Sequence, residues 1–165
     1  MMKTRKVVGL FMVLLASILL VACGQKTKDG VPTILQDKYS GYSNVDGYKS
    51  GIFAEGGSEL VFDKEKHTIV NLSNNDGKNI YYYQVIPEDK LSSADKGILA
   101  KHKEELKGKD YFIINVDWSK ENLEDDGIHY GVVLSDDGKS IRIFEFEWQG
   151  GSSDLYYNFN GKATK

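Results

Sequence analysis

Residues 130–148 read YGVVLSDDGKSIRIFEFEW, and this stretch has the pattern of an antiparallel hairpin. Two largely apolar runs, 130–134 and 141–148, flank the polar sequence Asp136-Asp137-Gly138-Lys139. Asp and Gly are favoured at turn positions that need a positive φ. The stretch therefore predicts two paired strands joined by a short turn.

The same pattern occurs twice earlier in the chain. Residues 58–62 and 68–72 flank the polar residues 63–67, which is the spacing of a second hairpin. Asn-Asn-Asp-Gly-Lys at 74–78 then separates the second run from the aromatic run at 80–86. Antiparallel neighbours are expected throughout.

One helix is predicted between these groups of strands, over about 91–107. Ser92 or Ser93 is placed to cap it, and Gly108 is placed to end it. Its apolar residues fall on one side at helical spacing: Ile98, Leu99 and Leu106. We expect this side to cover the sheet.

Residues 111–118 alternate, with Phe112, Ile114, Val116 and Trp118 on one face, and Leu155, Tyr157 and Phe159 form the last expected strand. The fold class is therefore mainly β (α+β). We expect an antiparallel meander of about eight strands, forming a closed or partly open β-barrel, because closure removes exposed strand edges. A cystatin-like helix-on-sheet layout is the alternative.

The chain has 165 residues, of which 41% are hydrophobic and 27% charged, so it is sized for one folded domain. We place this domain at residues 34–165. The most apolar segment lies before it: Lys3, Arg5 and Lys6 precede a nearly unbroken apolar run at 7–22. A positive start followed by a short apolar run is typical of a secretory signal peptide, here residues 1–22.

The end of this segment, Leu20-Val21-Ala22-Cys23, resembles the lipobox of bacterial lipoproteins. The resemblance implies cleavage by signal peptidase II before Cys23 and a diacylglycerol thioether on that cysteine. Two acyl chains make a stable membrane anchor, which a single chain does not. The expected location is the extracytoplasmic face of the cell membrane, and the expected membrane contact is the lipid on Cys23.

The alternative for the apolar segment is a transmembrane helix with Cys23 as an ordinary thiol. A spanning helix needs about 20 apolar residues, whereas this run is shorter and contains Gly9 and Ser17. Residues 23–33 are polar and without a periodic pattern, so they are predicted to be the lipidated N-terminus and a flexible tether.

Charge excludes one class of partner. Loss of residues 1–22 removes three positive charges and no negative ones, which takes the formal net charge from −3 to −6. An acidic domain disfavours nucleic-acid binding, and no dense Lys/Arg run is visible in the sequence to hold anionic lipid. Only Arg5 and Arg142 are arginines among 21 basic residues, a bias that favours a low-GC Gram-positive origin.

No cofactor, metal site or catalytic residue is predicted. The two Asp-Asp-Gly sequences at 125–127 and 136–138 place Val133 where an EF-hand calcium loop needs an acidic ligand. No nucleophile elbow or penicillin-binding signature is present. The remaining hydrolase hypothesis uses Glu145 and Glu147 as paired carboxylates. The simpler interpretation is that Phe144, Phe146 and Trp148 face the core while the glutamates face water.

The aromatic residues of the strands suggest a binding role. The layout is similar to the small lipocalin or calycin-like domains of bacterial lipoproteins, although no Gly-x-Trp lies near the first expected strand. The resemblance implies a cavity for a small apolar or aromatic ligand. Its candidate lining residues are Tyr81, Tyr83, Tyr111, Tyr130, Trp118 and Trp148. The alternative is a protein interaction or inhibitor module at the cell envelope.

Overall fold

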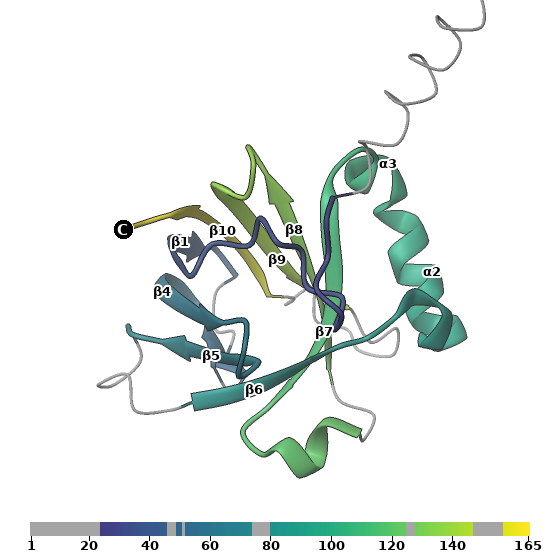
Figure 1. Ribbon diagram of the computed structural model, residues 1–165, viewed down its shortest axis with the longest axis horizontal. Helices are drawn as coiled ribbons and strands as arrows, with labels where there is room; N and C mark the ends of the chain where they lie inside the picture. Colours follow the sequence, from purple (N-terminus) through teal and green to yellow (C-terminus); the bar gives the residue numbers. More distant parts are fainter. Residues whose placement is uncertain (1–23, 46–48, 51, 74–79, 125–127, 147–156) are drawn as a thin grey trace, which may run out of the picture.

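The computed structural model describes residues 24–45, 49–50, 52–73, 80–124, 128–146 and 157–165. Eight antiparallel strands close into a barrel in the order β1-β10-β9-β8-β7-β6-β5-β4, with β1 pairing to β4 (Figure 1). The strands are β1 Lys38–Ser43, β4 Gly56–Asp63, β5 Thr68–Asn71, β6 Ile80–Val85, β7 Asp110–Asp117, β8 His129–Ser135, β9 Ser140–Glu145 and β10 Asn158–Ala163. The predicted mainly β barrel is confirmed.

The expected hairpins are formed where turn chemistry placed them. The β8–β9 turn places Asp136, Asp137 and Gly138 at φ values of 54°, 55° and 77°. Gly138 is doubly constrained, because a Cβ there would also lie within 3 Å of the Ile34 carbonyl. The turn residues therefore need no metal-binding role to explain them.

The predicted helix is present as two short helices on the outside of the barrel. After η2 (Glu88–Lys90), α2 spans Ser93–Lys101 and α3 spans Lys103–Leu106, with the break at His102. Ser92 is the cap, because its hydroxyl accepts a hydrogen bond from the backbone N–H of Asp95. The helices lie beside β7 in Figure 1.

Two hydrophobic clusters share the middle strands. One fills the barrel and the other lies between its outer face and the helices. In β9, Ile141 and Ile143 belong to the inner cluster, whereas Phe144 and Phe146 belong to the outer one. Phe144 and Phe146 are buried as expected, but in the outer cluster under the helices, and Glu145 is half-buried and not fully exposed to water. Trp148 and Glu147 lie outside the described residues.

Residues 24–33, predicted to be a flexible tether, pack on the barrel together with residues 34–37 of the predicted domain. Val31 and Leu35 are 0% and 1% exposed and belong to the inner cluster. Backbone hydrogen bonds from Thr27 to Val31 and from Thr33 to Gln25 hold the segment in a compact turn. The polar composition misled the prediction because two apolar side chains are enough to seat the segment on the barrel.

Two further short elements connect the barrel strands. β2 (Lys49–Ser50) and β3 (Phe53–Ala54) pair with each other between β1 and β4, and η3 (Lys120–Glu124) follows β7. The barrel end that carries the β4–β5 and β8–β9 turns is called here the N-terminal end, because segment 24–37 lies there. The opposite end, which carries β2 and β3, is called the far end.

Candidate functional site

The barrel interior is occupied by its own side chains. Tyr83 and Tyr130, two of the predicted ligand-binding residues, are 1% and 2% exposed within the inner cluster. Phe53 enters from the far end and contacts Tyr157 and Tyr130, with ring centroids 4.5 and 4.6 Å away. Burial raises the pKa of Tyr83 and of Tyr157, which keeps both phenols neutral. These tyrosines thus pack against other side chains inside the barrel.

The N-terminal end is closed by hydrogen bonds as well as apolar contact. The Tyr39 hydroxyl donates to the Gly138 carbonyl at 2.7 Å and accepts from the Gln36 backbone N–H at 2.9 Å. Burial raises the pKa of Tyr39 to about 12. The Lys64 ammonium donates to the Leu35 carbonyl at 2.7 Å. The Tyr39 hydroxyl and the Gly138 and Leu35 carbonyls are therefore paired within the chain.

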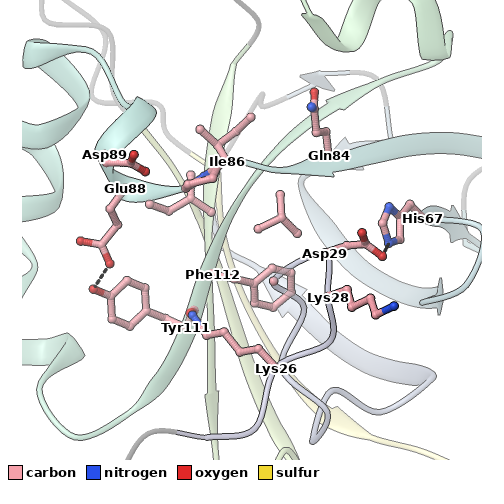
Figure 2. A pocket seen from close by; sticks show the side chains of 14 residues that line it. Lys26, Lys28, Asp29, His67, Gln84, Ile86, Glu88, Asp89, Tyr111 and Phe112 are labelled. Atoms are coloured by element: carbon pink, nitrogen blue, oxygen red, sulfur yellow. Dashed lines mark hydrogen bonds and ion pairs between the residues drawn. The ribbon is translucent and has the colours of Figure 1, made fainter.

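A cleft of about 740 Å³ lies at the N-terminal end, outside the filled interior (Figure 2). Segment 24–30 forms one side, the end of β6 and η2 form another, and β7 contributes Tyr111, Phe112 and Ile113. The Tyr111 hydroxyl donates to Glu88 Oε1 at 2.7 Å, and burial with this hydrogen bond raises the pKa of Tyr111 to about 12. Of the predicted ligand residues, Tyr111 lines a real cleft.

On the other side of this cleft, His67 Nε2 lies 3.6 Å from Asp29 Oδ2, and the His67 ring stacks on Tyr83. Lys26 and Lys28 add positive charge to the rim, opposite Glu88 and Asp89 (Figure 2). The cleft thus combines apolar lining with charges of both signs, and its volume is in the range of small-molecule sites.

The far end exposes apolar side chains. Trp118 is 70% exposed, and Leu72, Ile128 and Ile80 are between 44% and 51% exposed. They stand at the end of β5, the start of β6, the end of β7 and the start of β8, and these strands are neighbours in the barrel. Antiparallel order places all four at one end, and we call them the far rim.

The other predicted ligand residues are dispersed. Tyr81 is half-buried against the inner cluster, and Trp148 lies outside the described residues. The structure thus separates the predicted set into core residues, one cleft residue and one rim residue. The sequence could not distinguish these, because alternation places side chains on faces without showing what covers a face.

The histidines have structural partners. His129 Nδ1 lies 3.2 Å from Asp95 Oδ2, and the Ser92 hydroxyl donates to the same carboxylate oxygen at 2.7 Å. A catalytic triad needs the serine on the histidine's other nitrogen, whereas here Ser92 caps the helix. This cluster ties the start of α2 to the start of β8.

The candidate carboxylate Glu145 accepts a hydrogen bond from the Tyr157 backbone N–H at 3.2 Å, while Glu147 lies outside the described residues. No cluster of three or more His, Cys, Asp or Glu side chains suited to a metal ion occurs in the described ranges. Leu20, Val21, Ala22 and Cys23 lie outside the described residues. Within the described chain no helix has the length and apolarity to cross a bilayer.

No protein-family model matches this chain, and neither a curated protein nor a solved structure is significantly similar to it.

Proposed function

We propose that this protein is a lipid-anchored, extracytoplasmic binding module without enzymatic activity, and that its partner is a protein bound at the far rim. The observation that carries the proposal is the exposure of Trp118 at 70% beside three other exposed apolar residues at one barrel end. Apolar side chains gathered on one surface mark interaction sites, and Trp is enriched among the residues that dominate binding energy.

The position of Gly24, the residue after the proposed anchor, supports this orientation. Gly24 lies so close to Asp110, the first residue of β7, that a Cβ on Gly24 would lie within 3 Å of the Asp110 carboxylate. Trp118 follows the last residue of the same strand, about 26 Å from Asp110 along an extended strand. An anchor on Cys23 would leave the far rim at the opposite end from the membrane, where a partner has access.

The rim proposal is tested by photo-crosslinking in the host cell. A photoreactive residue at Ile128 should produce a discrete crosslinked protein, and Trp118→Ser should lower its yield severalfold. The matched control places the same residue at Glu65, an exposed turn residue of the N-terminal end. Equal crosslinking from both positions, or no effect of Trp118→Ser, would contradict the proposal.

The anchor is tested separately with Cys23→Ala. The substituted chain should lose the diacylglycerol mass and remain uncleaved or be shed. If it remains in the membrane as a processed protein that needs detergent for extraction, anchoring through Cys23 is wrong.

The cleft at the N-terminal end supports a second candidate function, the binding of a small ligand. Its volume of about 740 Å³ and its mixed lining carry this alternative. Native and denatured masses of the chain from its host should differ by a reproducible ligand mass, and Val85→Glu in the cleft wall should remove that mass. A bare monomer in the native spectrum would contradict it.

A further inference from the structure

A second groove, of about 840 Å³, lies between the helices and the start of β7. Its lining includes four lysines, Lys96, Lys103, Lys107 and Lys109, against two carboxylates, Glu88 and Glu104. Leu99, Ala100, Leu106 and Tyr111 supply its apolar part. We call this the lysine groove. Its positive balance contrasts with the formal charge of −6 of the chain after residue 22.

Three of the four lysines of the groove are available for an external anion, whereas the Lys96 ammonium donates to the Asp89 carbonyl at 3.3 Å. Lys103, Lys107 and Lys109 are exposed, and no ion pair among the described residues involves any of these three. Long lysine stems beside apolar surface favour an arrangement in which the ammonium groups reach outward. Such a surface is complementary to a layer of anionic headgroups.

Gly24, the first residue that the structure describes, lies next to this groove. Gly24 lies against Asp110, the residue that follows Lys109, and the Lys26 ammonium donates to the Tyr111 carbonyl at 3.4 Å. In Figure 1 the first described segment runs alongside β7 at the end near α3. A lipid on Cys23, one residue before Gly24, would therefore hold the groove within a few residues' reach of the bilayer surface.

We infer that the lysine groove docks on the anionic phospholipid headgroups of the anchoring membrane. This inference rests on the anchoring proposed above and gives the barrel a fixed orientation, with α3 toward the bilayer and the far rim toward the outside. The acyl chains retain the protein at the membrane, and the lysines determine which surface faces it. A barrel held by the acyl chains alone would rotate freely about its N-terminus.

The test uses the full lipidated chain in vesicles of phosphatidylcholine, with and without phosphatidylglycerol, and measures amide hydrogen exchange over residues 103–109. Exchange should slow severalfold in the anionic vesicles and recover in high salt, because exposed charges are screened. One lysine near an anionic surface changes partitioning about fivefold, so the triple variant Lys103→Glu, Lys107→Glu, Lys109→Glu should abolish this protection.

A matched pair of single reversals controls for net charge. Lys107→Glu should lose a large part of the protection, whereas Lys120→Glu, near the far end of β7, should retain it. Exchange in β8 should be the same in all variants, which verifies that they are folded. Equal exchange over 103–109 in the two lipid mixtures, or equal loss in Lys107→Glu and Lys120→Glu, would overturn the inference.

The same samples separate this inference from the proposed function. The mass of the N-terminal peptide reports whether Cys23 carries diacylglycerol. An unmodified Cys23 contradicts the proposed anchor but not the groove inference. Flotation of the unmodified chain with anionic vesicles then tests whether the groove binds anionic lipid. If Ile128 gives no crosslink while anionic vesicles still protect residues 103–109 from exchange, the partner proposal is contradicted and the groove inference stands.

Discussion

The two ends of the barrel are closed by different chemistry. At the N-terminal end, segment 24–37 seats Val31 and Leu35 and pairs buried polar atoms through the Tyr39 hydroxyl. At the far end, Phe53 stacks on Tyr157 inside, while Trp118 and its rim neighbours remain exposed outside. Side chains are buried at both ends, whereas the rim residues are exposed, and the rim is the surface at which we propose that a partner binds.

The largest predicted effect is on the far-end closure. Phe53→Ala should lower the free energy of unfolding by about 3–5 kcal/mol, because it leaves a cavity against Tyr157 and Tyr130. Val31→Ala at the other end should lower the free energy of unfolding by about 2 kcal/mol, because it removes two carbon atoms and not a six-carbon ring. Denaturant unfolding of both variants measures the difference. Equal losses would contradict the prediction, because burial alone makes a phenyl ring worth more than the two methyl groups of valine.

A smaller effect is expected from the polar closure. Tyr39→Phe should cost about 1–2 kcal/mol at neutral pH, because the buried Gly138 carbonyl loses its donor. Tyr42→Phe, on a side chain that is 61% exposed, is the control and should be neutral.

The Tyr39 closure also has a predicted pH dependence. The folded pKa of Tyr39 is raised to about 12 from the ordinary 10, so its contribution is complete below pH 10 and is lost as the pH rises through 12. The stability gap between wild type and Tyr39→Phe should therefore narrow between pH 10 and 12 in denaturant unfolding. A constant gap over this range would mean that the phenol is not buried.

Loss of the α2 cap should lower the free energy of unfolding by about 1 kcal/mol. Ser92→Ala removes the hydrogen bond to the Asp95 N–H, whereas the adjacent Ser93→Ala removes none and should be nearly neutral. Chemical denaturation compares the two. A similar loss of stability in both variants would show that the effect comes from the helix propensity of serine and not from capping.

The smallest predicted effect on stability is at the rim itself. Trp118→Ser should change the free energy of unfolding by less than about 0.5 kcal/mol, because the side chain is 70% exposed. The same substitution should reduce crosslinking at Ile128 severalfold. A loss of stability comparable to that of Phe53→Ala would show that Trp118 stabilises the fold. It would also remove the main support for a binding rim.

Local sequence patterns were informative where local chemistry decides the structure. The turn at Asp136-Asp137-Gly138 and the cap at Ser92 follow from backbone requirements of a few residues. The burial of Val31 could not be predicted in this way. Whether one apolar residue of a polar segment is buried depends on the barrel end against which it packs. The tyrosine set failed to identify one site for the same reason: Tyr83 is core, while Tyr111 lines a cleft.

The sequence by itself determined the antiparallel, mainly β fold class and a capped helix, because turn residues and alternation act over a few neighbouring positions; barrel closure was expected beside a cystatin-like alternative. Only the tertiary structure decided that tyrosines fill the barrel, that Phe144 lies under a helix, and that Trp118 shares a rim with Ile80. It also decided that Gly24 lies beside the lysine groove, near Lys109. These relations join residues far apart in the chain, and they arise from barrel closure and the packing of the helices on it.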